Sequence, residues 1–242
     1  MKTFGLIGKN IDYSFSRAYF KKKFESEKIY DCNYVNFDIN DINEIEQVFE
    51  NQNRGYNVTI PYKETIIPFL SKLNQDAQEI GAVNTIKVHK DKSLEGFNTD
   101  FYGFYQSLKP HLKSHHTKAL ILGTGGASKA IAFALKKLNI DFQFVSRNPK
   151  TNEISYADLS EKEFEEAKII INTTPIGTFP NIENCPDLPY SFFTEDHIAY
   201  DLIYNPQETK FLQKAKEKKA TTINGLQMLI LQAEKAWEIW NS

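Results

Sequence analysis

A glycine cluster near the middle of the chain, Gly123-Thr124-Gly125-Gly126-Ala127, has the residue types that bind a pyrophosphate. It follows an apolar run at residues 119–122 and precedes a helical pattern that reaches residue 138. Glycine permits a tight turn from a strand into a helix, whose free amides and positive dipole end attract phosphate. Ser128 replaces the last glycine of the usual G-x-G-x-x-G spacing. The cluster predicts a dinucleotide site, the alternative being a glycine-rich turn without a ligand.

The end of the next expected strand indicates which dinucleotide is bound. This strand, at residues 142–146, ends in Ser146-Arg147-Asn148. An NAD enzyme carries an acidic residue about 20 positions after the glycines to bind the ribose hydroxyls. An arginine suits the 2′-phosphate of NADP instead, and Lys150 offers a second cation. NADP is therefore the predicted cofactor, unless Arg147 is only a surface residue at a strand end.

Polar clusters in the first half of the chain follow expected strands or lie in loops. Because a rigid scaffold can converge such side chains on one crevice, they are candidates for a second ligand site. Other interpretations remain open from the residues alone: Ser14, Ser16 and Asp100 also suit helix caps, and Lys63 suits an exposed helix face. The clusters are Tyr13-Ser14-Phe15-Ser16, Asn57-Val58-Thr59-Ile60-Pro61-Tyr62-Lys63, Gly81-Ala82-Val83-Asn84-Thr85 and Gly96-Phe97-Asn98-Thr99-Asp100.

Six segments, in order along nearly the whole chain, resemble the shikimate dehydrogenase family. Each segment alone is a weak signal, and the combination at these spacings is specific. The segments are Gly5-Leu6-Ile7-Gly8 with Ser14-Phe15-Ser16, Asn57 to Lys63, Gly81 to Thr85, Asn98-Thr99-Asp100, Gly123 to Ala127, and Gly225-Leu226-Gln227-Met228-Leu229 followed by Gln232.

The resemblance implies a reversible, NADPH-dependent reduction of 3-dehydroshikimate to shikimate, in the pathway to chorismate and the aromatic amino acids. It implies Lys63 and Asp100 as the catalytic pair. The implied substrate-binding residues are Ser14, Ser16, Thr59, Lys63, Asn84, Asp100, Tyr204 and Gln232. The cofactor set, from the glycine motif and the resemblance together, is Gly123, Gly125, Gly126, Ala127, Ser146, Arg147, Asn148, Thr173, Leu202 and Gly225.

These residue types suit the implied chemistry. Reduction of a ketone places negative charge on its oxygen as hydride arrives, and a nearby cationic acid both stabilises that charge and delivers the proton. Lys63 can do both, with Asp100 orienting its ammonium group. Hydroxyl donors at Ser14 and Ser16 would hold the substrate carboxylate without a strong ion pair.

Two positions depart from the family pattern, which has a histidine before the first serine and a proline after the second. This chain has Tyr13 and Arg17 there, and quinate is therefore an alternative substrate. A non-catalytic NADP-binding regulator of the same fold is a further alternative, which the retention of both Lys63 and Asp100 disfavours. An enzyme acting on a folate is disfavoured by the serine pair and Gln232.

The elements that position these residues alternate between β-type runs and helical patterns, which predicts an α/β fold of two domains with mostly parallel sheets. We expect a substrate domain at residues 1–100, completed by a returning C-terminal helix at 225–242, and a Rossmann-like, doubly wound NADP domain at 101–224. Expected strands lie at 3–7, 33–37, 56–59, 84–89, 94–98, 119–122, 142–146, 169–171, 198–202 and 221–223. Expected helices lie at 14–27, 42–49, 61–70 with Pro61 in the first turn, 100–112, 209–218 and 226–240.

Composition restricts the remaining possibilities. A net charge of -2 over 242 residues is not that of a nucleic-acid-binding protein. Cys32 and Cys185 have no metal-ligand or disulfide spacing, and His115-His116 is expected in a solvated loop, so no metal is predicted. Apolar runs too short for a signal sequence or a membrane span predict a cytoplasmic protein, working as a monomer or homodimer on a small molecule.

Overall fold

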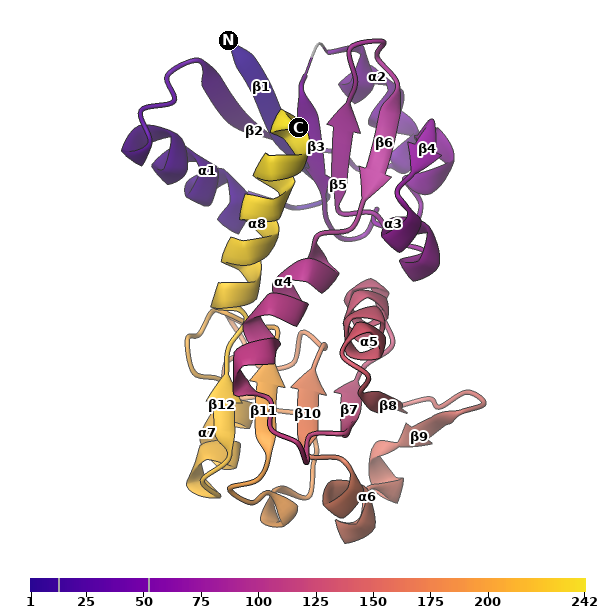
Figure 1. The fold of residues 1–242 in the computed structure, drawn as a ribbon, viewed down its shortest axis with the longest axis vertical. Coiled ribbons are helices and arrows are strands. Elements are labelled where there is room, and N and C mark those ends of the chain that lie inside the picture. The colour runs from indigo at the N-terminus through magenta and orange to yellow at the C-terminus, as the bar shows by residue number, and fades with distance from the viewer. Residues whose placement is uncertain (13, 52) are drawn as a thin grey trace. The chain divides into compact units, whose positions relative to one another are not determined.

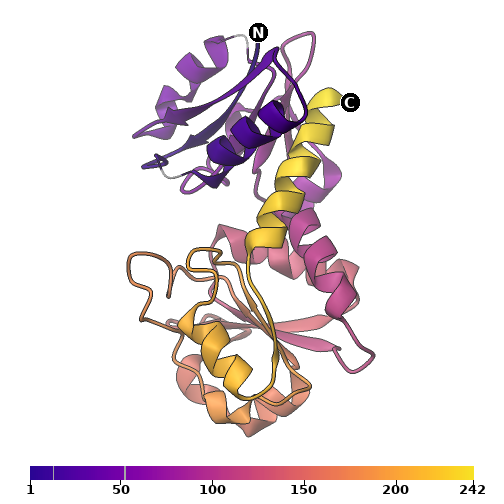
Figure 2. The same ribbon diagram turned by 90° about the vertical axis from the view of Figure 1, so that its left-hand side faces the viewer.

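The computed structural model describes residues 1–12, 14–51 and 53–242. The chain forms two compact units, Met1–Thr99 with Gln232–Ser242 and Asp100–Leu231, each built on a six-stranded sheet (Figures 1 and 2). The last helix, α8 (Leu226–Asn241), begins in the second unit and ends in the first. The predicted α/β class with two parallel-rich sheets is confirmed.

The sheet of the first unit has the strand order β2-β1-β3-β5-β6-β4. Strand β1 runs parallel to both β2 and β3, whereas β5 is antiparallel to β3 and β6. The strands are β1 (Lys2–Gly8), β2 (Cys32–Asp38), β3 (Gly55–Val58), β4 (Lys72–Leu73), β5 (Thr85–Val88) and β6 (Leu94–Phe97). The helices are α1 (Phe15–Ser26), α2 (Ile45–Glu50) and α3 (Gln75–Ile80).

An aromatic cluster holds the end of α8 in the first unit. The Trp240 ring stacks on Phe4 of β1 with centroids 4.8 Å apart, and its Nε1 donates to the Ile86 carbonyl at 3.0 Å. Gly55 lies directly beneath this ring, since a Cβ there would be 2.3 Å from Trp240. The Trp240 ring occupies the space that a side chain at position 55 of β3 would fill. The absence of a side chain at Gly55 therefore fixes where the C-terminal residues pack.

The sheet of the second unit is parallel throughout, in the order β12-β11-β10-β7-β8-β9. If these strands are numbered 1 to 6 in chain order and read from β9 to β12, this is the 3-2-1-4-5-6 order of the Rossmann fold. The strands are β7 (Lys118–Leu122), β8 (Asp141–Ser146), β9 (Glu153–Ser155), β10 (Ile169–Asn172), β11 (Ile198–Asp201) and β12 (Thr221–Ile223). The helices are α4 (Asp100–Leu108), α5 (Gly126–Lys137), α6 (Glu161–Glu166) and α7 (Lys210–Glu217).

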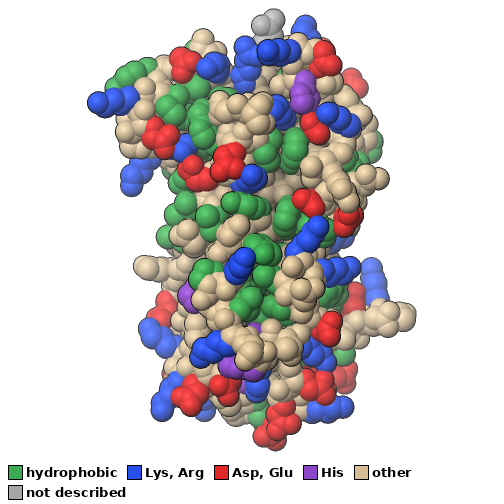
Figure 3. All heavy atoms as spheres, in the orientation of Figure 1, with side chains coloured by type: hydrophobic (Ala, Val, Ile, Leu, Met, Phe, Trp, Pro, Cys, Tyr) green, Lys and Arg blue, Asp and Glu red, His purple; other side chains and the backbone are tan. Residues whose placement is uncertain are grey.

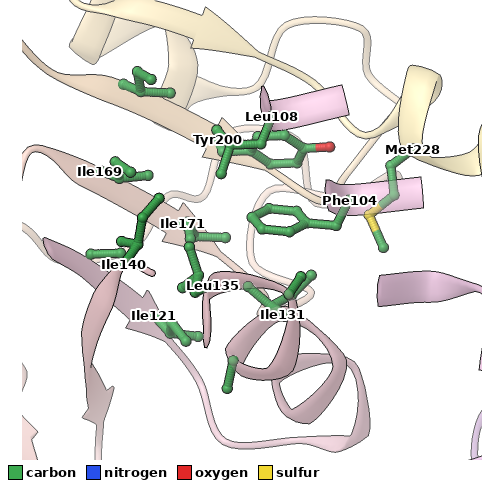
Figure 4. Packing of buried hydrophobic residues seen from close by; sticks show 14 residues of the cluster. Phe104, Leu108, Ile121, Ile131, Leu135, Ile140, Ile169, Ile171, Tyr200 and Met228 are labelled. Atoms are coloured by element: carbon green, nitrogen blue, oxygen red, sulfur yellow. The ribbon is translucent and has the colours of Figure 1, made fainter. Parts of the chain in front are cut away.

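Apolar side chains from α4, α5 and the central strands form the core on one face of this sheet (Figure 4). Phe104 of α4 meets Tyr200 of β11 edge to face at 4.8 Å. The Tyr200 hydroxyl reaches Ser107 at 2.7 Å, so the buried phenol has a hydrogen-bond partner.

The helix expected over residues 61–70 is absent, and that prediction is wrong. Turns follow Ile60, and only a short 3-10 helix forms at Ile67–Phe69. Pro68 explains the difference, because a proline inside the expected helix has no amide to donate and disfavours a helical residue before it.

Two short helices were missed although the sequence marks both. Helix α3 begins after Asn74, whose side chain accepts from the Asp76 amide at 3.0 Å, and ends at Gly81 with φ of 71°. Helix α6 begins with a capping box between Ser160 and Glu163. The edge strands β4 and β9 are too short to give a periodic pattern.

The surface carries charges of both signs. On the face in Figure 3, basic and acidic side chains are interspersed, in keeping with the net charge of -2. Among the residues that the structure describes, no helix combines the length and apolar character needed to cross a membrane.

Candidate functional site

One edge of the first sheet collects the predicted substrate-binding residues of this unit. In parallel β1 and β3, Ile7 lies opposite Val58, and antiparallel β5 places Thr85 opposite both Asn57 and Phe97. The segments after β1, after β3, before β5 and after β6 therefore meet at the same edge. Those segments carry Ser14, Ser16, Thr59, Lys63, Asn84 and Thr99.

A buried amide network brings residues from distant segments together at this edge. The Asn84 Oδ1 accepts from the Thr99 amide at 2.6 Å, and its Nδ2 donates to the Thr99 hydroxyl at 3.0 Å and to Gln232 Oε1 at 3.4 Å. Asn57, which lies in a candidate cluster but had no predicted role of its own, donates to the Asn84 carbonyl at 3.2 Å and accepts from the Tyr34 hydroxyl at 2.8 Å. The predicted pair Asn84 and Gln232 thus lies in one hydrogen-bonded cluster.

The two serines lie at the start of α1. Ser14 is the N-cap, and its Oγ accepts from the Arg17 amide at 3.4 Å, as the capping interpretation predicts. Its hydroxyl proton is still able to donate to a carboxylate, which the helix N-terminus also attracts. Ser16, in the first turn, lies within hydrogen-bonding reach of the Tyr34 phenol, whose pKa burial raises. Tyr13 lies outside the described residues.

Lys63 lies in a turn that a backbone hydrogen bond holds in place, and not on a helix face. Its carbonyl accepts from the Val83 amide at 2.7 Å, directly beside Asn84. Thr59 is fixed by its amide, which donates to the Ile7 carbonyl at 2.9 Å. The backbone at Thr59 is therefore hydrogen-bonded to β1, and the backbone at Lys63 is hydrogen-bonded to the segment just before β5.

Two predicted residues belong to the second unit. Asp100 is the first residue of α4, so the N-cap position is that of Thr99. The Asp100 side chain is buried, with 8% exposed. Tyr204 is half-buried, and burial raises the pKa of its phenol. Because Lys63 and Asp100 lie in different units, their catalytic pairing stays a prediction.

The glycine turn between β7 and α5 fits a pyrophosphate. Gly123 has φ of 100°, and a Cβ there would come within 3.0 Å of both Thr173 and Thr174. Gly125 faces open space, and as the N-cap of α5 it offers no side chain to the helix amides. Strand β7 lies between β8 and β10, where the strand order reverses and nucleotides bind in this fold.

The other predicted cofactor residues follow neighbouring strands. At the end of β8, Ser146 Oγ accepts from the Asn148 amide at 3.3 Å, and Arg147 is exposed. After β10, the Thr173 hydroxyl donates to the Leu122 carbonyl at 2.6 Å. Its oxygen is left as an acceptor, which suits a ribose hydroxyl better than a phosphate.

Leu202 and Gly225 meet after β11. The Leu202 amide donates to the Asn172 carbonyl at 3.0 Å, and the Gly225 amide donates to the Ile203 carbonyl at 3.0 Å. A Cβ on Gly225 would lie 2.0 Å from the Leu202 carbonyl oxygen. Only glycine fits at that position.

Asp201, which was not predicted, is a fully buried carboxyl group at the end of β11. It accepts from the Thr209 hydroxyl at 2.6 Å, the Asn172 Nδ2 at 3.1 Å and the Ile203 amide at 3.1 Å. Burial raises its pKa to about 6. An acidic residue that ends an otherwise apolar strand was the available signal.

The histidine pair matches its prediction only in part, because His115 is exposed whereas His116 is 6% exposed. Its Nδ1 accepts from the Lys113 amide at 2.8 Å and its Nε2 donates to the Asp196 carbonyl at 3.0 Å. Burial lowers the pKa of this imidazole, which favours the neutral tautomer that makes both bonds. In the described ranges, no cluster of three or more histidine, cysteine or acidic residues could hold a metal ion.

Known proteins resemble the chain over nearly its whole length. A family model described as the shikimate dehydrogenase substrate binding domain matches residues 6–86. A shikimate dehydrogenase (NADP(+)) of Clostridium botulinum is 39% identical over 251 residues, covering 99% of this chain and 96% of the relative.

Solved structures show the same similarity. A shikimate dehydrogenase in complex with NADP+ has a TM-score of 0.89 at 36% identity, covering 99% of this chain and 90% of its own. The enzyme of Aquifex aeolicus has a TM-score of 0.87 at 33% identity, covering 100% and 92%.

The raised pKa of Asp201 predicts a pH-dependent stability. Between its ordinary value of 3.8 and about 6, the folded protein binds this proton more tightly than the unfolded chain. The stabilisation is complete below the lower value and lost above the higher one, a fall of about 2 kcal/mol from about pH 4.5 to about pH 7.5. Because asparagine does not titrate, Asp201→Asn should lose this fall, as measured by urea unfolding at both pH values.

The exposed Asp91→Asn is the control, since hydrogen bonds from Ser93 lower the pKa of Asp91, so that its titration lies below this pH range and the fall should be kept. A wild type and Asp201→Asn with parallel pH profiles would contradict the raised pKa.

Proposed function

The chain belongs to the shikimate dehydrogenase family, and on that premise we propose that it catalyses the reversible, NADPH-dependent reduction of 3-dehydroshikimate to shikimate. It is an oxidoreductase that acts on a CH–OH group, and its cofactor is NADP. The observation that carries the proposal in the structure is the Asn84–Thr99–Gln232 cluster, which shares a sheet edge with Ser14, Thr59 and Lys63. The reaction belongs to the biosynthesis of chorismate and the aromatic amino acids.

In this proposal the first unit binds the substrate. Ser14 and Ser16 donate hydroxyl protons to the substrate carboxylate at the N-terminus of α1. Thr59, Asn84 and Gln232 bind the ring hydroxyls. The remaining substrate contacts come from Lys63, Asp100 and Tyr204.

Lys63 carries the proton chemistry. Bound NADPH supplies the hydride. The Lys63 ammonium stabilises the negative charge that develops on the carbonyl oxygen and then donates its proton to that oxygen. In the reverse direction the neutral amine accepts the hydroxyl proton, and Asp100 orients the side chain in both directions.

The second unit binds the cofactor. The amides at the start of α5, with Gly123, Gly125, Gly126 and Ala127, would hold the pyrophosphate. Ser146, Arg147 and Asn148 would hold the 2′-phosphate, because a guanidinium attracts it and a carboxylate would repel it. Thr173, Leu202 and Gly225 would complete the site along the carboxyl ends of β10 and β11.

Quinate is the second candidate substrate, because Tyr13 and Arg17 depart from the family pattern beside the serine pair. Arg17 follows the serine pair, and its guanidinium donates to the Asp12 carbonyl at 3.4 Å in the loop that leads to α1. A cation near the carboxylate-binding serines alters this part of the site relative to the family pattern. We also propose a cytoplasmic protein, monomeric or homodimeric, without a nucleic-acid or membrane partner.

The direct test is an assay of the purified protein with shikimate or quinate and with NADP+ or NAD+, following the absorbance of reduced nicotinamide. We expect the fastest turnover with shikimate and NADP+. Faster turnover of quinate with NAD+ would overturn both the substrate and the cofactor preference. Binding of NADP+ without turnover of either acid would favour the regulator.

Replacement of Lys63 tests the proton chemistry. Lys63→Ala should lower kcat by roughly 10²–10⁴-fold, because it removes the general acid, and should change the KM for shikimate much less. The exposed Lys22→Ala in α1 is the matched control and should leave kcat unchanged. A kcat near the wild-type value in Lys63→Ala, with the fold intact by circular dichroism, would remove Lys63 from the mechanism.

Replacement of Arg147 tests the recognition of the 2′-phosphate. Arg147→Asp should raise the KM for NADP+ by about 10-fold or more and leave the KM for NAD+ little changed, since it removes a charge-assisted bond to phosphate. Arg54→Asp, at an exposed arginine of the first unit, is the control. An unchanged ratio of the two KM values would mean that other residues read the phosphate.

A further inference from the structure

Asp201 is buried without a charged partner, which is an unusual position for a carboxyl group. It is 0% exposed, and within the described part of the chain no lysine, arginine or histidine forms an ion pair with it. Burying a carboxyl group costs free energy unless its oxygens are hydrogen-bonded. Both oxygens are: Oδ1 accepts from Asn172 and Ile203, and Oδ2 accepts from Thr209.

The first of these bonds leads to the loop after β10. The Asn172 Nδ2 donates to Asp201 at 3.1 Å, which fixes the amide so that its Oδ1 faces the other way. That oxygen accepts from the Thr174 amide at 3.0 Å and the Thr174 hydroxyl at 2.7 Å. The orientation of Asn172 therefore sets the path of Thr173 and Thr174, whose side chains would lie 3.0 Å from a Cβ at Gly123.

The second bond leads to the loop after β11 and to the start of α8. The Ile203 amide donates to Asp201 at 3.1 Å, and the Ile203 carbonyl accepts from the Gly225 amide at 3.0 Å. Leu202 lies between these contacts, with its amide on the Asn172 carbonyl at 3.0 Å. One carboxyl group thus connects the segments that carry Thr173, Leu202 and Gly225.

We propose that Asp201 is a positioning residue for the cofactor, which holds the loops after β10 and β11 and the Gly225 turn in the arrangement that binds NADP. It does not contact the cofactor and acts through Asn172 and Ile203. The inference rests on the proposed function, because the three positioned residues are those proposed to bind NADP. It accounts for a buried acid that the chemistry of the reaction does not use.

The test compares three variants by NADP+ affinity, measured by isothermal titration calorimetry, and by the KM values for NADP+ and shikimate. Asp201→Ala removes all three hydrogen bonds, and we expect a rise of about 10-fold or more in the Kd and KM for NADP+. The KM for shikimate should stay within about 3-fold, since its proposed site lies mainly in the first unit. Asp201→Asn keeps the shape and the acceptor for Asn172 and Ile203, and should restore affinity to within about 3-fold of wild type.

Tyr200→Phe is the matched control. Tyr200 precedes Asp201 on β11, is fully buried and loses one hydrogen bond, to Ser107, when its hydroxyl is removed. It should lower stability without changing the Kd for NADP+. If Asp201→Ala does not fold, Thr209→Val removes the donor to Asp201 Oδ2 together with the α7 N-cap bond from the Leu212 amide, and we expect a smaller rise in Kd in the same direction.

Several results would overturn the inference. One is a wild-type Kd for NADP+ in every folded Asp201 and Thr209 variant. Another is a rise in Kd for Tyr200→Phe as large as that for Asp201→Ala. A third is a rise in the KM for shikimate in Asp201→Ala as large as the rise in its KM for NADP+. Failure of the proposed function is distinguishable. A wild type that binds NADP+ but oxidises no shikimate refutes the proposed reaction and leaves the calorimetric comparison intact, whereas a wild type that binds no NADP+ refutes both.

Discussion

A buried side-chain amide must have hydrogen-bond partners for both its nitrogen and its oxygen, and this requirement organises the carboxyl edge of each sheet. In the first unit, Asn84 satisfies it with Thr99 and Gln232, which joins the end of β6 to α8. In the second unit, Asn172 satisfies it with Asp201 and Thr174, which joins the ends of β10 and β11. Loops that carry candidate site residues are thereby fixed to the scaffold before any ligand binds.

Apart from the short edge strands β4 and β9, the strands could be predicted from β-type runs long enough to be recognised, and Ile169-Ile170-Ile171 of β10 is an example. The Rossmann order followed from that alternation with helices. The segment around Lys63 could not be predicted as well, because Pro61 alone suits a helix start while Pro68 prevents the helix. Helix α3 was missed because its 6 residues make fewer than two turns, although Asn74 and Gly81 mark its two ends.

The candidate site shows a similar division. Short motifs located Ser14, Asn84, Gly123 and Gly225 because their residue types are distinctive in sequence. Asn57 had no predicted role of its own and Asp201 was not predicted at all. Each residue makes its hydrogen bonds with a partner far along the chain, Asn84 at 27 positions and Asn172 at 29 positions. Pairings of this range depend on the sheet register, which no local pattern contains.

The central claim is that the substrate binds mainly to the first unit and the cofactor to the second, and amide chemical-shift titrations by NMR test it most directly. Shikimate alone should shift amides in residues 14–17, 59–63, 84–85 and 99 and at Gln232. NADP+ alone should shift amides in residues 123–127 and 146–148 and at Thr173, Leu202 and Gly225. Shikimate shifts centred on the glycine turn, or NADP+ shifts centred on the Asn84 cluster, would contradict the account.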